Sequence, residues 1–201
     1  MNTNGNLYTI IYTSVIVILV AALLAFVSQS LKGKQEANEK ADIMSQMMTA
    51  DGIGTKASFQ EMGNAAVLEK YAAEISEAFT VNVKGEKVSD ISLDNVWSPS
   101  LLKAQNNNIK KGNLDAVEAP VFKFKNGTTV VPIYGAGLWG PVWGYIALKA
   151  DGKTMIGSYF DHESETAGLG AKIKDDPAFQ AEFTDEMADF SQNRIFEIVK
   201  G

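Results

Sequence analysis

An uncharged stretch of about 21 residues, 7–27, constrains this chain more than any other part of the sequence. Aliphatic and small side chains fill it, and a helix of that length reaches about 30 Å, the thickness of a bilayer's hydrocarbon core. A helix also pairs every backbone polar group internally, as lipid requires. No basic residue precedes the stretch, and its apolar core is longer than that of a signal peptide. We therefore predict an uncleaved transmembrane anchor.

The sequence after the anchor is polar and mixed. Removing the anchor and its flank leaves about 150 residues, enough for one well-packed domain. The net charge is −6, and no basic cluster occurs beyond Lys32, Lys34 and Lys40, which argues against a nucleic-acid partner. The sequence has no cysteine, which excludes disulfides, thiolate zinc sites, iron–sulfur ligation and a cysteine nucleophile within it. The three lysines, taken alone, favour a cytoplasmic domain by the positive-inside rule.

Helical patterns dominate the first half of the predicted domain. Gln35–Ala50 consists of good helix formers, and its apolar residues recur at spacings of three to four, at Ala37, Ala41, Met44 and Met48. Asp51–Gly54 should end this helix. A second amphipathic helix is predicted over Asn64–Phe79, with Asn64 as its cap.

A short hairpin is predicted over Thr80–Val88, around Lys84-Gly85. Asp90–Ala116 is mixed and polar, and its run Asn106–Asn108 is interpreted as a solvated loop. No internal repeat or low-complexity linker is present, which favours one domain.

Strand patterns become clear after Pro120. Val121–Lys125 alternates, Asn126-Gly127 indicates a type I′ turn, and Thr128–Tyr134 continues the hairpin. A second hairpin is predicted from Trp143–Leu148 and Thr154–Phe160, joined by Asp151-Gly152. Asp176 should cap a helix that has Pro177 first and Phe179 and Phe183 on one face, and Arg194–Val199 has a strand's composition. This mixture predicts an α+β fold with an antiparallel sheet and flanking helices.

Catalytic constellations are scarce in this sequence. His162 is the only histidine and no G-x-S-x-G elbow exists, so a Ser-His-acid triad is not indicated. The plain interpretation of His162 is a loop histidine at a strand end, and that of Asp161, Glu163 and Glu165 is a solvated acidic cluster. We predict no catalytic residue and no metal site.

Two glycine-rich loops are more suggestive. Gly135–Pro141 follows a strand but leads to another strand, so it is not a dinucleotide fingerprint, which needs a following helix. The second loop is Glu165–Gly170 (Glu-Thr-Ala-Gly-Leu-Gly). Glycines allow positive φ or the close approach of a flat ligand, so each loop is either a tight turn or a ligand wall. Trp139 and Trp143 could stack on a planar ring, although aromatic side chains beside a sheet are mainly core.

The motifs Tyr134–Trp139 and Glu165–Gly170, in this order behind one span, resemble the C subunit of the sodium-translocating NADH:quinone reductase. The stretches Trp143–Leu148 and Asp151–Thr154 are also similar to that family. The likeness extends over nearly the whole chain. The G subunit of the Rnf complex shares the second motif more than the first.

The resemblance implies an electron-transfer subunit with FMN bound through its phosphate to a threonine hydroxyl. It also implies which residues surround the isoalloxazine ring: Trp139, Gly140, Glu165, Thr166, Gly168, Leu169, Gly170 and Lys172. Lys172 would approach the electron-rich N1–O2 edge, with a solvated lysine as the alternative. The cofactor supplies the electron chemistry, so the protein needs no acid or base of its own.

Two departures from the family pattern matter. Ala167 stands where the family usually has proline, which should cost some rigidity of the turn. The family's modified threonine ends a Ser/Thr-Gly-Ala-Thr motif, which is missing from residues 1–201. We expect this threonine beyond Gly201, with a protein that lacks covalent flavin as the alternative.

The expected organisation is an anchor (1–31), a juxtamembrane helix and linker (32–60) and an FMN-binding domain (61–201). The implied partners are membrane lipid, the polytopic B, D and E subunits, and the A and F subunits; sodium ligands would lie in polytopic partners. The family places the chain in the bacterial inner membrane with its soluble domain in the periplasm, and we prefer this to the weak lysine signal. The alternatives are an Rnf-type G subunit and a membrane-anchored assembly module without a cofactor.

Overall fold

The computed structural model describes residues 5–93, 95 and 97–188, and the chain divides into two compact units, 1–39 and 40–201. Helix α1 (Asn6–Ala50) begins in the first unit and ends in the second. The helix predicted over Gln35–Ala50 is therefore the last part of a longer, unbroken element. It ends before Asp51–Gly54, as predicted.

The first unit is helical and apolar. An 18-residue window of α1 has a mean hydropathy of 2.9, and by length and composition this helix can cross a membrane. Its large side chains are exposed, among them Leu7 at 72% and Phe26 at 73%. The hydroxyl of Thr13 donates to the backbone oxygen of Thr9 at 2.8 Å, so this polar side chain is paired within the helix. The first unit thus has the properties of the predicted anchor.

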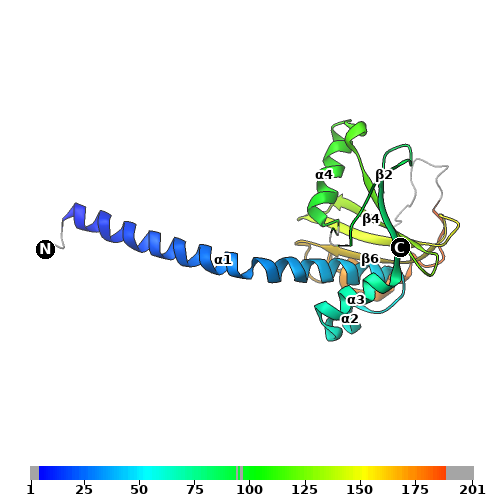
Figure 1. Cartoon of the computed structure of the whole chain (residues 1–201), viewed down its shortest axis with the longest axis horizontal. Helices are drawn as coiled ribbons and strands as arrows, with labels where there is room; N and C mark the ends of the chain where they lie inside the picture. The colour runs from blue at the N-terminus through cyan, green and yellow to red at the C-terminus, as the bar shows by residue number, and fades with distance from the viewer. Residues whose placement is uncertain (1–4, 94, 96, 189–201) are drawn as a thin grey trace. The chain divides into compact units, whose positions relative to one another are not determined.

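An antiparallel sheet of six strands forms the second unit, in the order β2-β1-β3-β4-β5-β6 (Figure 1). This confirms the predicted α+β class and both hairpins that follow Pro120. The hairpin around Lys84-Gly85 is also present, and Gly85 has a φ of +80°. The strands are β1 (Ile75–Val81), β2 (Lys87–Asp90), β3 (Ala119–Phe124), β4 (Thr129–Ala136), β5 (Pro141–Leu148) and β6 (Met155–His162).

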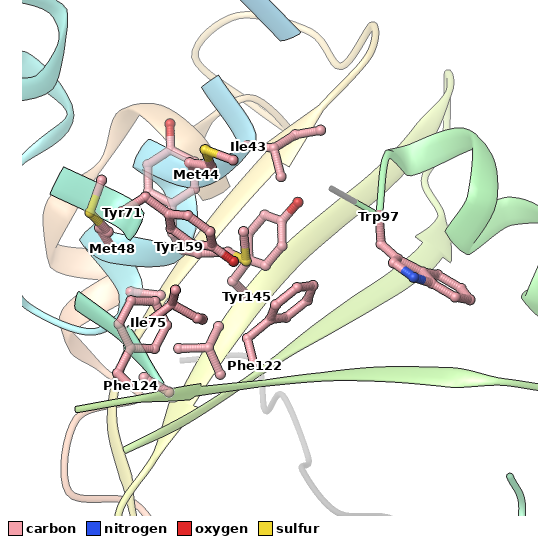
Figure 2. Close-up of a cluster of buried hydrophobic side chains, with 14 of the residues drawn as sticks. Ile43, Met44, Met48, Tyr71, Ile75, Trp97, Phe122, Phe124, Tyr145 and Tyr159 are labelled. Carbon is pink, nitrogen blue, oxygen red and sulfur yellow. The ribbon is translucent and has the colours of Figure 1, made fainter. Parts of the chain in front are cut away.

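The hydrophobic core lies between one face of the sheet and the helices, including the last part of α1. Met44, Met47 and Met48 are at most 2% exposed, which confirms the predicted stripe at Met44 and Met48, whereas Ala37 is exposed. Figure 2 shows how Met44 and Met48 lie among aromatic side chains such as Tyr71 of helix α3 (Asn64–Glu74). Figure 2 also labels Phe122, Phe124, Tyr145 and Tyr159, which come from β3, β5 and β6, and Trp97, which comes from the connection between β2 and β3.

The helix predicted over Asn64–Phe79 is wrong in its last five residues. Helix α3 (Asn64–Glu74) stops at Glu74, and Ile75 begins β1, which pairs with β3 on one side and β2 on the other. Two partner strands outweigh a local helical pattern, because each ladder position gains a backbone hydrogen bond. The N-cap is Gly63, without a side-chain bond, so the predicted cap at Asn64 is also wrong. A short helix not predicted, α2 (Lys56–Met62), precedes α3 and is capped by a Thr55–Ser58 box.

The asparagine run is helical and not a solvated loop. Helix α4 (Pro99–Lys110) includes Asn106–Asn108 and packs against β4 (Figure 1). Pro99 at its first position starts the helix, and Leu102 on its inner side is buried. Burial of one apolar face therefore outweighs the weak helix propensity of asparagine. A single 3₁₀ turn, η1 (Leu114–Ala116), leads to β3.

The turn between β3 and β4 differs from the predicted type I′. A type I′ turn needs positive φ at both central residues, but only Gly127 has one, at +87°. The backbone N–H of Phe124 donates to the oxygen of Thr128 at 2.9 Å, which closes a three-residue connection. Gly127 therefore takes the left-handed position of a bulged hairpin.

The opposite face of the sheet carries two short helices, α5 (Lys172–Asp175) and α6 (Pro177–Ala181), which contact β6. Asp176 caps α6 by accepting from the N–H of Ala178 at 3.0 Å, as predicted. Phe179 and Phe183 contact each other with ring centroids 5.5 Å apart, and both contact Phe160 of β6. The strand predicted over Arg194–Val199 lies outside the described residues.

Asp51, which follows α1 directly, joins the helix end to the β3–β4 turn. Its carboxylate is 7% exposed and accepts from Asn126 Nδ2 at 2.8 Å and from the hydroxyl of Thr128. Burial raises the pKa of Asp51 above its ordinary value of 3.8, although both hydrogen bonds act in the opposite direction.

We expect Asp51→Asn to cost about 1 kcal/mol, with a cost that depends on pH. Because the folded pKa is raised, the native state holds this proton more tightly than the unfolded state, so wild type loses stability as pH rises above 3.8. The free-energy difference between wild type and the variant should therefore shrink with rising pH in urea titrations. A difference that grows as pH rises would contradict this account of Asp51.

Candidate functional site

The topology brings both glycine-rich motifs to one end of the sheet. The first lies in the connection between β4 and β5, and the second directly follows β6. In the ladders, Val142 pairs with Gly135 on one side and with His162 on the other. Since antiparallel neighbours alternate in direction, the end of β4, the start of β5 and the end of β6 lie at the same end of the sheet. Residues 137–140 and 163–171 are therefore adjacent loops.

Glu165 holds the two loops together. Its Oε1 accepts the backbone N–H of Trp139 at 3.1 Å, and the neighbouring Ser164 hydroxyl donates to the backbone oxygen of Trp139 at 3.3 Å. Glycines make room for this contact: a Cβ at Gly137 would collide with Oε1 of Glu165, and one at Gly170 would lie 2.6 Å from its Oε2. The glycines of both motifs thus admit one carboxylate between two backbones.

Apolar side chains remain exposed on these loops. Leu138 is 79% exposed, Trp139 66% and Leu169 72%. The backbone of Trp139 is held by its contacts with Glu165 and Ser164, and the backbone N–H of Leu169 donates to the oxygen of Thr166. These three exposed apolar side chains stand on two adjacent loops, which makes the loops a candidate binding surface.

The second motif folds as a tight turn. The backbone oxygen of Thr166 accepts from the N–H groups of Leu169 and Ala171, each at 3.1 Å, and Gly168 has a φ of +74°. A positive φ at the third residue is typical of a type II turn, in which proline is favoured at the second residue, here Ala167. The position where the resemblance leads us to expect proline is therefore one that suits it.

Ala167→Pro is expected to stabilise the second unit by about 0.4–1 kcal/mol, because proline restricts the unfolded chain at a compatible position. Ala167 is exposed, and among the described residues its backbone N–H donates to none, so the ring should displace nothing. Urea unfolding of the variant and of wild type measures the gain. A loss of stability would mean that this turn is not of the proposed type.

The solvated interpretation of the acidic cluster is wrong for Asp161 but holds for Glu163, which is exposed. Asp161 is 4% exposed and forms an ion pair with Lys174 of α5, with Nζ and Oδ1 2.7 Å apart. His162, at the end of β6 as expected, is half-buried, and its Nδ1 accepts from the backbone N–H of Glu165 at 3.1 Å. Glu163 remains exposed. The pKa of Tyr134 is raised, mainly by the partial burial of its hydroxyl and also by the negative charge of Glu163.

The other predicted residues take less specific positions. Lys172 is exposed at the start of α5 and forms no ion pair with any residue that the structure describes. The structure brings Trp139, Gly140 and Glu165 together, with Thr166–Gly170 continuing the same loop. Within the described part of the chain, no group of three His, Asp or Glu side chains could hold a metal ion.

An apolar cavity of about 390 Å³ lies beside α5 and α6, and Tyr134 and Gly135 of the first motif form part of its lining. Phe160, Phe179 and Phe183 form its aromatic wall, and none of the described residues that line it is charged. The indole N–H of Trp143, one of its few polar groups, already donates to Gln46. A phosphate group would therefore find no cation there, so we place the candidate site on the two loops.

Sequence reasoning missed three contributors to this site: Ser164, the acceptor Nδ1 of His162, and Gln46 of α1. Gln46 donates from Nε2 to Asp161 at 3.0 Å across 115 positions of sequence. No spacing rule connects residues so far apart. The polar Gln46 within a methionine-rich helical stripe was the single available signal.

Comparisons with known proteins agree with this geometry. Residues 137–198, which include both loops, match the FMN-binding domain family. A crystal structure of the C subunit of Na(+)-translocating NADH-quinone reductase from Parabacteroides distasonis is 32% identical, covers 80% of this chain and 72% of that one, and has a TM-score of 0.64. NqrC of Shewanella oneidensis, at 23% identity and a TM-score of 0.62, shares the fold.

Curated relatives have the same name. The C subunit of this reductase from Vibrio parahaemolyticus is 25% identical over 92% of this chain and 74% of the relative. Its counterpart from Chlamydia trachomatis is 38% identical over 36% of this chain. The chain spans about a quarter or less of the length of the first curated relatives that it matches. With the fold, the motifs and these similarities combined, the chain belongs to the family of the Na(+)-translocating NADH-quinone reductase C subunit.

Proposed function

We propose that this chain is a membrane-anchored electron-transfer subunit that binds FMN in a Na⁺-translocating NADH:quinone oxidoreductase. The observation that carries the proposal is the pair of loops joined by Glu165, which leave Trp139 and Leu169 exposed. The match of residues 137–198 to the FMN-binding domain family and the names of the relatives support it. We further propose 61–201 as the flavin-binding domain.

The loop residues fit a flat redox cofactor. Trp139 offers an aromatic face and Leu169 an aliphatic face. Glycine at position 140 lets the two loops approach closely, because a Cβ there would lie 2.5 Å from the Ser164 hydroxyl. Bound FMN supplies the electron chemistry, since an isoalloxazine ring accepts and passes on electrons. We propose that the exposed ammonium of Lys172 faces the N1–O2 edge, where positive charge favours the reduced ring.

Each remaining residue contributes position and not proton transfer. We propose that Thr166 and the backbone of Gly168 and Gly170 border the ring, and that Leu169 excludes water from it. Glu165 is engaged by the N–H of Trp139, so its role is to fix the distance between the two loops. The site therefore needs no general acid or base, in line with a relay of electrons.

Attachment is proposed to be covalent, through a phosphoester to a threonine hydroxyl. None of the threonines in residues 1–201 is assigned this role, and the Ser/Thr-Gly-Ala-Thr pattern of the family is expected beyond Gly201. We propose the A, B, D, E and F subunits and membrane lipid as partners. The proposed location is the bacterial inner membrane, with the flavin domain in the periplasm. The name of the relatives favours this complex over a role as an Rnf-type G subunit, which would take electrons from ferredoxin.

Trp139→Ala should lower the visible circular dichroism of the bound flavin in the purified full-length protein, because the isoalloxazine ring loses its stacking partner while the covalent bond keeps the flavin on the chain. The control is Leu114→Ala, which removes an exposed apolar side chain, 48% accessible, from η1. The visible circular dichroism per bound flavin is compared after purification in detergent. Equal signals from both variants and wild type would exclude Trp139 as a stacking partner of the flavin.

A further inference from the structure

Gln46 lies at the centre of a polar network within the second unit, in which Asp161 is buried and Asp42 is exposed. It is 1% exposed, and its Nε2 donates to Asp42 Oδ2 at 2.7 Å and to Asp161 Oδ2 at 3.0 Å. Its Oε1 accepts the indole N–H of Trp143 at 3.3 Å. Both amide hydrogens and the amide oxygen are thus used, which fixes the orientation of the side chain. The lysines Lys56 and Lys174 balance the two carboxylates.

Asp161 extends this network toward the loop. Its Oδ2 accepts a hydrogen bond from Nε2 of Gln46. Its Oδ1 accepts the backbone N–H of His162 at 2.8 Å and forms an ion pair with Nζ of Lys174 at 2.7 Å. Both oxygens are therefore engaged in a side chain that is 4% exposed. This arrangement fixes the backbone at the end of β6, where the chain leaves the sheet.

His162 continues the series into the candidate site. Its Nδ1 accepts the backbone N–H of Glu165 at 3.1 Å, and Glu165 in turn accepts the N–H of Trp139. A tautomer with its proton on Nε2 leaves Nδ1 able to accept. Hydrogen bonds thus run without interruption from Gln46 of α1, through Asp161 and His162, to both loops.

We infer that His162 is a positioning residue, which sets the place of Glu165 and thereby the spacing of the two loops. The effect of His162 on the spacing of the loops is independent of the proposed function, whereas its effect on a bound flavin rests on that function. The sequence alone indicated a strand-end histidine without a role. In the structure, the imidazole of His162 accepts a hydrogen bond from the backbone N–H of Glu165, the residue whose carboxylate joins the two loops.

Two polar substitutions of different reach test the inference. Asparagine carries its amide oxygen at the same number of bonds from Cβ as Nδ1 of histidine, so His162→Asn can accept from Glu165. His162→Gln places its oxygen one bond further away and leaves the Glu165 N–H without this acceptor. Amide hydrogen exchange of Glu165 and Trp139 is followed in the full-length protein, and exchange at Tyr145 and Tyr159 in the sheet reports whether each variant is folded.

We expect His162→Gln to raise exchange at Glu165 and Trp139 about tenfold and His162→Asn to leave it within about twofold of wild type. Equal exchange in both variants and wild type would overturn the inference. The flavin part is read from the visible circular dichroism of bound FMN, which should lose amplitude in His162→Gln and be rescued in His162→Asn. An unchanged flavin signal despite faster exchange would overturn that part. A wild-type protein without flavin would overturn the proposed function instead, and the exchange result would still decide on the loops.

Discussion

Gln46→Glu should destabilise the second unit by about 3–5 kcal/mol at neutral pH. The variant places a third carboxylate between those of Asp42 and Asp161, at a position that is 1% exposed. The new oxygen would replace the Nε2 donor of both bonds, so attraction becomes repulsion at two contacts. Lys56 and Lys174 are already paired with the two aspartates and cannot neutralise a third charge.

The measurement is urea unfolding of the full-length protein in detergent, followed by tryptophan fluorescence. Gln60→Glu is the matched control, because Gln60 has the same chemistry and lies exposed on α2. Its effect should remain within about 0.5 kcal/mol. A loss below about 1 kcal/mol for Gln46→Glu would show that the network is open to water.

Gly157→Ala is expected to cost about 1–3 kcal/mol, the usual range for overpacking. A Cβ on Gly157 of β6 would lie 2.5 Å from the backbone oxygen of Ala50, the last residue of α1. Backbone cannot rotate away as a side chain can, so either α1 or β6 must shift. The close approach of this helix end to the sheet is thus possible only with glycine.

Gly135→Ala serves as the control for Gly157→Ala. Gly135 also lies in a strand of this sheet, but a Cβ there would meet nothing within 4 Å. The control should therefore be neutral or slightly stabilising, because alanine loses less backbone entropy on folding than glycine. If both variants lose the same free energy of unfolding, the contact with Ala50 is not the cause.

Local chemistry explains which parts of the fold could be predicted. Gly85 supplies positive φ at the first hairpin, and Asp176 accepts from the second helical N–H, so each signal acts within a few residues. The antiparallel hairpins after Pro120 follow from the same logic. The type I′ assignment failed because Asn126-Gly127 also fits a three-residue connection, and only the pairing of Phe124 with Thr128 decides between them.

Tertiary pairing explains the errors in the first half of the domain. Ile75–Phe79 has apolar residues at helical spacing, but it becomes strand because β2 and β3 are available on both sides. The asparagines of α4 are helical because the same helix buries Leu102 in the hydrophobic core. In both cases the deciding contact comes from residues far away in the sequence, which no local window includes.

The candidate site shows the same division. Resemblance identified the residues of both loops, and the structure adds how Glu165 connects them. The roles of Thr166, Gly168 and Lys172 toward a flavin stay predictions. Gln46 and Asp161 could not be paired from sequence, because a bond across 115 positions depends on how α1 meets the sheet.

The flavin content of the full-length gene product tests the central claim most directly. The protein is purified from its native membrane, denatured and separated by electrophoresis, and the polypeptide band is examined for flavin fluorescence and for the added mass of FMN. We predict one FMN per chain that stays with the denatured polypeptide. A full-length protein that carries no flavin before or after denaturation would contradict the account.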